Sequence, residues 1–185
     1  IKLNKTIRAK VLACSAATID RLLCATRRQY RLKGRSTTKP GSLLKQSIQV
    51  RTFADWNDTR PGFFEVDLVA FCGDAVRDDY VNGLNLTDVA TGWVGLAAVM
   101  GKASSRVNPA IDGVRKRLPF TMLGIDSDNG SEFINQLLKR YCEHHEITFT
   151  RSRPYKKNDN CYVEQKNYRV MRRFLGYARY DTDFQ

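Results

Sequence analysis

The sequence predicts an α/β fold, a mixed five-stranded sheet with helices on both faces, preceded by a small basic helical segment. Three strand-like runs follow one another between residues 62 and 100, which is the order of an antiparallel meander. Beyond residue 104, runs with helical and strand periodicity alternate, which is the order of strands joined through helices. A chain of 185 residues can bury one good core and carry a small module beside it.

The N-terminal segment has the pattern of a short helical pair. Apolar residues recur at helical spacing in residues 8–30, and Ser15 is placed to cap a helix that begins at the next residue. Residues 16–24 would then be the reading helix of a helix-turn-helix, although any small basic helical hairpin has the same pattern. We expect residues 1–32 to be a partial helix-turn-helix-like DNA-binding segment, with Arg21 as one DNA contact.

A linker and the core follow. Residues 33–51 are rich in Gly, Ser, Thr, Pro and basic residues, as is typical of a linker, so the core is predicted to cover residues 52–185. Its elements in chain order are expected to be strand 62–71, two strands within 82–100 that turn near Thr91-Gly92, helix 104–118, strand 121–126, helix 131–143, strand 147–152 and helix 163–177.

Charge is distributed unevenly within a net charge of +12. Residues 1–51 hold 13 basic residues against one acidic residue, residues 52–150 hold 9 against 14, and residues 151–185 hold 9 against 4. Basic ends around an acidic middle are typical of a protein that grips a polyanion beside a cluster of carboxylates, and solvated basic faces without a partner are the alternative.

Composition excludes several classes of protein. No apolar run approaches the roughly 18–20 residues that span a bilayer, so we expect a soluble protein. The five cysteines are scattered and form no C-x-x-C pair, which argues against structural zinc and a disulfide framework and favours a reducing cytoplasm. Because the first residue is Ile rather than Met, we expect a partial chain.

Acidic residues at the ends of core elements are the candidates for chemistry. Asp67 lies among large apolar neighbours in a strand, where an unpaired acid costs several kcal/mol; Glu65 shares its side but is expected to be nearer solvent. Asp128 follows a strand and precedes Asn-Gly and a helix, at the crevice where open α/β sheets bind ligands. Asp126 is still within that strand and is more simply a turn or supporting acid. Glu164 begins the last helix.

The spacing of these acids resembles a known family. Between Asp128 and Glu164 lie 35 residues, and with Asp67 they resemble the D,D,E triad of retroviral integrases and related insertion-sequence transposases. The runs RTFADW, PGFFEVD, TDVATGW, GIDSDNGSEFIN, ITFTRSRPYKKNDNCYVEQKN and GYARY look like one group of bacterial insertion-sequence transposases. The resemblance covers residues 52–180. Residues 1–51 contain no His/Cys zinc module of the retroviral kind, and because the family usually has more chain on both sides, we expect its C-terminal extension to lie outside this partial chain.

The resemblance implies a ribonuclease H-like fold and a metal-dependent DNA transposase or integrase. Asp67 would bridge two Mg²⁺ or Mn²⁺ ions, Asp128 would hold one of them and Glu164 the other. The partners implied are element ends and target DNA, in a homo-oligomer that is at least a dimer. The implied location is the bacterial cytoplasm, in association with the nucleoid.

The last helix is predicted to have one apolar face that packs on the sheet and one basic face. Val163, Val170 and Phe174 recur at spacings of 7 and 4, which predicts the stripe that packs on the sheet. Several basic residues recur on another face, where the DNA backbone would pass, with an ordinary solvated face as the alternative. Beyond Arg21, the residues that we assign to DNA contacts are Lys156, Lys157, Lys166, Asn167, Arg169 and Arg173.

Two other functions stay open at this point. A ribonuclease H-like nuclease that only hydrolyses its substrate would use the same three acids. A truncated transposase remnant would still occupy DNA without catalysis, although all three acids are present here.

Overall fold

The computed structural model describes residues 4–30, 44–52, 59–154 and 156–182. The chain divides into two compact units, residues 1–37 and residues 38–185, and each is described by itself. The predicted linker between residues 33 and 43, and most of the run RTFADW, lie outside the described residues. Among the described helices, none has the length and apolar content that crossing a membrane requires.

The N-terminal unit contains helices α1 (Lys5–Leu12) and α2 (Ala16–Tyr30). The predicted cap is confirmed, because the Ser15 hydroxyl accepts a hydrogen bond of 3.2 Å from the backbone N–H of Thr18. Leu22 is 69% exposed, and no residue of α1 is buried. The two helices therefore bury little apolar surface in the part of this unit that the structure describes.

The second unit is built on a six-stranded mixed sheet with the order β1-β6-β5-β2-β3-β4. Its strands are β1 (Gln49–Val50), β2 (Phe63–Ala70), β3 (Val81–Asp88), β4 (Val94–Met100), β5 (Gly124–Ser127) and β6 (Thr148–Arg151). Strands β2, β3 and β4 form the predicted antiparallel meander, and β5, β6 and β1 continue the sheet in parallel from the other edge of β2. The predicted mixed sheet is confirmed, with one strand more than expected.

The extra strand, β1, lies within the segment predicted as a linker. Gln49 pairs with Thr150 and Val50 with Arg151, and Ile48 beside them is 4% exposed. A short 3-10 helix, η1 (Leu44–Ser47), precedes them. The linker prediction was therefore wrong from residue 44 onward, because a two-residue strand is too short to show a periodic pattern in a polar, basic segment.

This correction changes where the chain can be cut. Deleting residues 1–37 should leave the melting temperature of the sheet unit nearly unchanged. Deleting residues 1–51 should cost about 2–5 kcal/mol of unfolding free energy, because it removes the buried Ile48 side chain together with β1. Thermal denaturation of both deletion variants measures the difference, and equal stability would place residues 38–51 outside the core.

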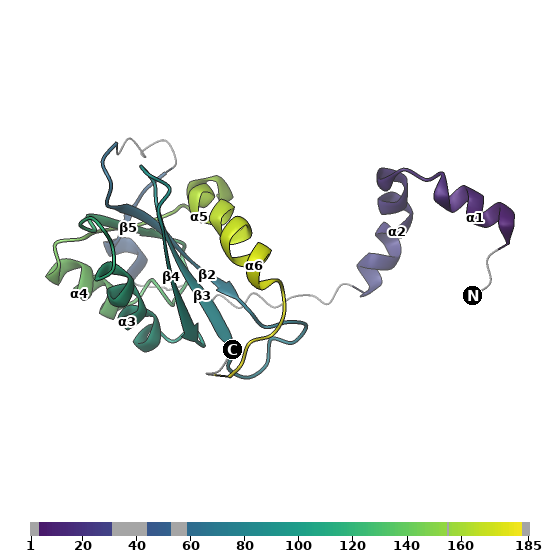
Figure 1. Cartoon of the computed structure of the whole chain (residues 1–185). Helices are drawn as coiled ribbons and strands as arrows, with labels where there is room; N and C mark the ends of the chain where they lie inside the picture. The colour runs from purple at the N-terminus through teal and green to yellow at the C-terminus, as the bar shows by residue number, and fades with distance from the viewer. Residues whose placement is uncertain (1–3, 31–43, 53–58, 155, 183–185) are drawn as a thin grey trace. The chain divides into compact units, whose positions relative to one another are not determined.

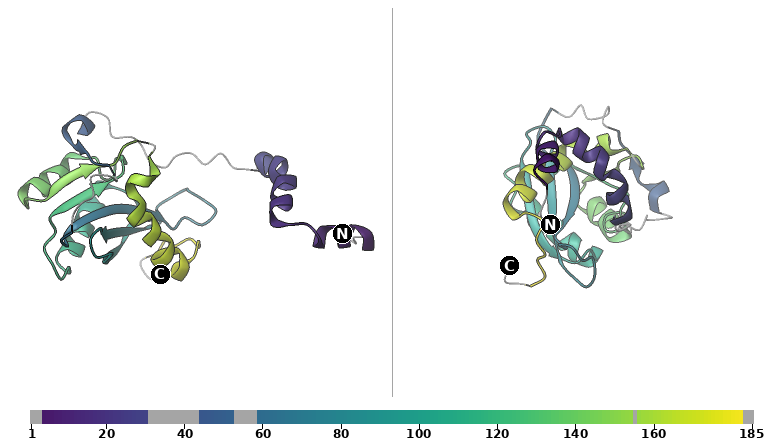
Figure 2. Two further views of the ribbon diagram at one scale, coloured as in Figure 1. Left: turned by 90° about the horizontal axis from the view of Figure 1, so that it is seen from above. Right: turned by 90° about the vertical axis from the view of Figure 1, so that its right-hand side faces the viewer.

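Helices cover the two faces of the sheet (Figure 1). Helices α3 (Ser104–Arg115) and α4 (Gln136–His144) lie on one face. The last helical segment crosses the other face as α5 (Cys161–Lys166), the π-helix η4 (Asn167–Arg172) and α6 (Arg173–Leu175), after the 3-10 turn η3 (Lys157–Asn160). The perpendicular views show the same two layers on either side of the strands (Figure 2). The prediction of helices on both faces is confirmed.

The alternation of side chains along β2 separates two apolar clusters. Phe64 and Val66 belong to the large cluster that includes residues of α3 and α4. Val69, and Phe71 just after the strand, pack with Met171 of the last helix. By the same alternation, Glu65 and Asp67 of β2 lie on the face of the sheet that the last helix covers.

The last helix does not keep the predicted packing stripe. Val163 is fully buried as expected, but Phe174 is 79% exposed, and Met171 rather than Val170 is the buried residue of the next turn. The π-helical turn explains the difference, because its i→i+5 hydrogen bonds add a residue and shift the following side chains around the axis. A stripe drawn for a regular α-helix is therefore wrong beyond residue 166.

Helix α4 also begins later than predicted, at Gln136. The side chain of Asn135 caps it by accepting a hydrogen bond of 2.8 Å from the backbone N–H of Leu138. Phe133 and Ile134, which the helical pattern included, are buried in the turn before the helix. The apolar pattern had joined the turn to the helix because both bury residues on the same side.

Candidate active site

Asp67 lies in the interior of β2, on the face covered by the last helix. Its Oδ1 accepts a hydrogen bond of 2.8 Å from the backbone N–H of Leu68, and its Oδ2 accepts one of 2.7 Å from the Asn167 amide. The Asn167 oxygen in turn accepts from the amide of Asn85 at 2.8 Å, and the Asn85 oxygen accepts from the hydroxyl of Thr87 at 3.1 Å. A relay from β3 through the last helix thus fixes the orientation of the Asp67 carboxylate.

Asp128 follows β5 and reaches the level of Asp67. Val66 pairs with Ser127 at the end of the parallel ladder, so the next residue of each strand is one of the two aspartates. The Asp128 Oδ1 accepts a hydrogen bond of 2.8 Å from the backbone N–H of Gly130, which holds the carboxylate in a turn. Burial, and after it the negative charge of Asp128, raise the pKa of Asp67 to about 7.

Glu164 lies on α5 and is exposed. Its charge contributes to the raised pKa of Asp67 and also acts on Glu65. The three predicted acids thus come from β2, from the turn after β5 and from α5, and the charges of Asp128 and Glu164 both act on Asp67.

Glu65 and Asp126 form a second pair of acids, two residues before Asp67 and Asp128 respectively. They are direct partners across β2 and β5, and their exposed fractions are 0% and 1%. The Glu65 Oε2 accepts a hydrogen bond of 2.8 Å from the backbone N–H of Val163, and the Asp126 Oδ1 accepts one from the hydroxyl of Thr150. Burial is the main cause that raises the pKa of Glu65 to about 8 and that of Asp126 to about 7.

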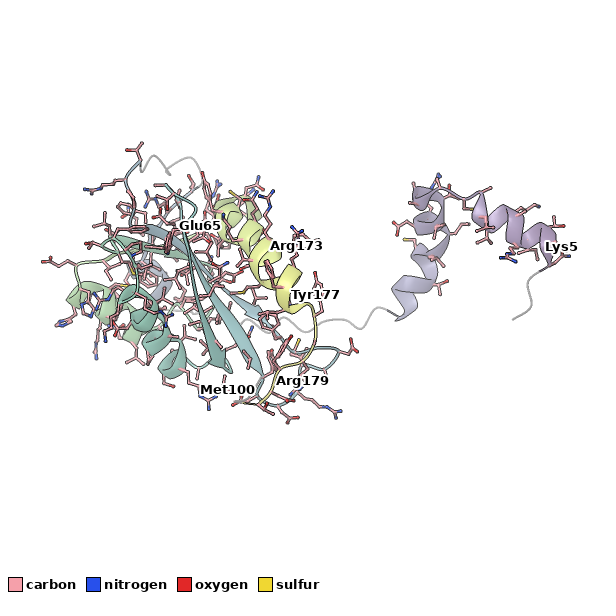
Figure 3. All side chains as sticks on the ribbon, in the orientation of Figure 1. Lys5, Glu65, Met100, Arg173, Tyr177 and Arg179 are labelled. Atoms are coloured by element: carbon pink, nitrogen blue, oxygen red, sulfur yellow. The ribbon has the colours of Figure 1, made fainter. Side chains whose placement is uncertain are left out.

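The expectation that Glu65 lies nearer solvent was wrong. It was based on the position of Glu65 close to the start of the strand, but α5 covers that end of β2, and Figure 3 labels Glu65 in the sheet beside the start of the last helix. Asp126 is a supporting acid in its geometry, since its carboxylate is bonded to the neighbouring strand.

The chemistry of these groups fits divalent metal ions, although no three acidic, His or Cys side chains within the described ranges already surround a single point. Mutual repulsion disfavours the charged form of Asp67, and a bound cation would relieve it. Each carboxylate oxygen of Asp67 accepts one hydrogen bond, from the Leu68 N–H or from the Asn167 amide, and can bind a further ligand. Hard carboxylate oxygens are the ligands that Mg²⁺ and Mn²⁺ prefer.

Known proteins share both the sequence and the fold of this chain to different extents. No protein-family model matches the sequence. The uncharacterized protein y4rM of Sinorhizobium fredii (strain NBRC 101917 / NGR234) is 41% identical over 179 residues, which are 97% of this chain and 51% of that protein. The chain thus spans about half the length of the curated relative that it matches.

Two solved structures are similar in fold. The catalytic core domain of BIV integrase aligns with a TM-score of 0.50 and 20% identity over 62% of this chain and 70% of that one. A chain of the simian T-cell lymphotropic virus intasome, in complex with PP2A regulatory subunit B56 gamma, aligns with a TM-score of 0.54 and 17% identity over 85% of this chain and 51% of that one. The sheet unit has the ribonuclease H-like fold of an integrase catalytic core. At these identities the comparison establishes the fold alone.

Three of the predicted DNA-binding residues, Lys166, Arg169 and Arg173, belong to the last helical segment. Arg169 and Arg173 are exposed. Lys166 is partly buried beside the turn between β3 and β4, where its Nζ lies 3.4 Å from the position that a side chain on Gly92 would occupy. Asn167 differs from them, because its amide is used inward, between Asp67 and Asn85.

The other predicted DNA-binding residues are spread more widely. Lys156 is exposed just before η3, and the side chain of Lys157 lies outside the described residues. Arg21 belongs to α2 in the N-terminal unit, where its Nε donates a hydrogen bond of 3.4 Å to the backbone oxygen of Ala17.

Arg172, which sequence reasoning did not single out, holds the last helix to the sheet. Its guanidinium donates a hydrogen bond of 2.8 Å to the backbone oxygen of Ala70 and lies over the rings of Phe71, at 5.0 Å, and Tyr177, at 4.7 Å. Arg169 and Arg173 on the same helical segment are exposed. From the sequence alone, Arg172 could not be distinguished from these two predicted DNA contacts.

The run TDVATGW has a structural role in the β3–β4 hairpin. Asp88 is fully buried and accepts hydrogen bonds from the backbone N–H groups of Gly62, at 2.7 Å, and Thr91, at 2.8 Å, and from the Thr91 hydroxyl at 2.6 Å. This acid fixes a turn rather than facing the group of Asp67. Asn85 and Thr87, by contrast, were missed, although polar residues at every second position of an apolar strand were a signal for them.

Proposed function

We propose that this chain contains the catalytic core of a DNA transposase or integrase that cleaves element ends and joins them to target DNA. The observation that supports it best is the convergence of Asp67, Asp128 and Glu164 on one face of a ribonuclease H-like sheet. Burial, and after it the charges of Asp128 and Glu164, raise the pKa of Asp67 to about 7. A cluster of this kind is a functional-site candidate on physical grounds.

In this proposal Asp67, Asp128 and Glu164 would together hold Mg²⁺ or Mn²⁺ ions through their carboxylate oxygens. When bound, the ions supply an activated oxygen nucleophile and stabilise the leaving oxygen of an in-line displacement at phosphorus. The protein contributes orientation. Asn167 and the backbone N–H of Leu68 direct the two oxygens of Asp67, and the backbone N–H of Gly130 directs Asp128.

The basic residues supply the grip on DNA. Lys166, Arg169 and Arg173 follow Glu164 along the same helical segment, and in this proposal they contact the phosphate backbone of DNA that enters the site. The N-terminal unit, with its excess of basic residues, is proposed to hold DNA as a helix-turn-helix-like module. Joining two element ends in one event implies at least two copies of the chain.

The basic face predicts a specific salt dependence. Changing Lys166, Arg169 or Arg173 singly to Gln should lower the slope of log affinity against log salt by about 0.9 for each duplex phosphate that the side chain had neutralised, whatever the DNA sequence. The measurement is binding to two unrelated duplexes across a salt series. Lys116→Gln, just after α3 at the opposite face of the sheet, is the matched control and should leave the slope unchanged. Unchanged slopes for all three variants would show that these residues form an ordinary solvated face and do not contact DNA phosphates.

The test of the function itself is transfer of a labelled DNA end into a plasmid. With the full reading frame, the DNA ends that flank it and Mg²⁺, we expect a covalently joined product. Nicked or shortened DNA without joining would favour a hydrolytic ribonuclease H-like nuclease. Intact DNA despite normal binding would favour a non-catalytic remnant.

A further inference from the structure

The helix that carries Glu164 begins without a cap of its own. The N-cap residue of α5, Asn160, makes no side-chain hydrogen bond to the helix, and its buried Oδ1 has no partner among the described residues. The first N–H groups of a helix need acceptors, and an N-cap side chain usually supplies one to the second or third residue. In α5 the third residue is Val163, and its N–H donates at 2.8 Å to Glu65 of β2.

Glu65 accepts this hydrogen bond from a fixed position in the sheet. It lies in the middle of the sheet, paired with Thr87 on β3 and with Asp126 on β5, and its side chain is fully buried. Because strands pair with β2 on both sides, the position of the carboxylate is set by the sheet rather than by a loop. The N–H groups of Val163 and Tyr162 both act on this carboxylate and lower its pKa against the larger effect of burial.

The connection runs directly between two of the proposed metal ligands. On β2, Glu65 lies two residues before Asp67 and on the same face. On α5, Val163 immediately precedes Glu164. The hydrogen bond from Val163 to Glu65 is therefore a short link between the strand that holds Asp67 and the helix turn that holds Glu164.

We propose that Glu65 is a positioning residue, which places Glu164 relative to Asp67 by capping α5 from the sheet. This role rests on the proposed function for its catalytic consequence. What the role requires is a buried acceptor for the Val163 N–H, so a neutral acceptor should serve as well as a carboxylate. A direct metal ligand, by contrast, would need the charge.

Two variants separate these roles. E65Q keeps a side chain of the same shape with an oxygen that can accept from Val163. E65M fills a similar volume without an acceptor, and replacing a buried carboxylate by a packed apolar side chain is often neutral for stability. Asn82→Leu is the matched control, because Asn82 is another fully buried polar residue of the sheet whose amide is bonded to Tyr80 and Gly101 at the far end of β3.

The experiment measures, in the full chain, amide hydrogen exchange at Val163, the affinity for Mn²⁺ from the electron paramagnetic resonance of the free ion, and end joining. For E65M we expect faster exchange at Val163 and a loss of roughly 10–100-fold in Mn²⁺ affinity and joining, the usual cost of removing a residue that orients metal ligands. E65Q and Asn82→Leu should stay close to wild type in all three.

Two results would overturn the proposal. Wild-type Mn²⁺ affinity and exchange in folded E65M would show that the cap does not place Glu164. Equal losses in E65Q and E65M would make the carboxylate itself a ligand. Failure of the proposed function is distinguishable, because the wild-type chain would then join no ends, while Val163 exchange in E65M would still decide whether Glu65 holds the helix.

Discussion

Replacing Asp128 by Asn should abolish cleavage and joining while leaving DNA binding nearly intact. The substitution removes a metal-binding charge but keeps the size of the side chain and the acceptor for the Gly130 N–H. We expect a loss of roughly 10³-fold or more, because bound ions supply several kcal/mol of transition-state stabilisation and each 1.4 kcal/mol is a factor of ten. Single-turnover cleavage and joining assays, with binding measured in parallel, give the comparison.

Asp126→Asn is the matched control, since it makes the same chemical change two residues earlier. Asp126 is buried and bonded to the Thr150 hydroxyl, and an amide oxygen can take over that bond. Its activity should stay close to wild type. An inactive Asp126→Asn beside an active Asp128→Asn would reverse the assignment of the two aspartates.

Much of the fold was predictable because its strands and helices carry strong local patterns. The meander of β2, β3 and β4 follows from three apolar runs with a turn at Thr91-Gly92, and the position of Asp67 within its strand follows from the first of these runs. The place of Asp128 was predictable from strand-end chemistry, and the 35-residue interval then directed attention to Glu164. Which of these acids hold metal stays a prediction.

What the sequence did not reveal depends on contacts between distant segments. Strand β1 exists only through its pairing with β6, and its two residues carry no periodic signal. The burial of Glu65 depends on α5 lying across the start of β2, which is 98 residues away in sequence. The π-helical turn that begins at Asn167 shifts the following side chains and leaves Phe174 at the surface, an outcome that a regular helical pattern does not contain.

The second large effect concerns the metal. Cleavage and joining should require Mg²⁺ or Mn²⁺ and should stop in excess chelator, because in the proposed mechanism the carboxylates act through the ions that they hold. Ca²⁺ should support DNA binding with little turnover, since a larger ion with flexible coordination holds the in-line geometry poorly. DNA binding measured in each metal separates assembly from chemistry.

The most direct test of the account is therefore end joining by the full reading frame across this metal series, with Asp128→Asn beside the wild type. We expect a joined product with Mg²⁺ and Mn²⁺, little or none with Ca²⁺ and none with chelator, and no joined product from Asp128→Asn in any metal. Full joining in excess chelator, or joining by Asp128→Asn at the wild-type rate, would contradict it.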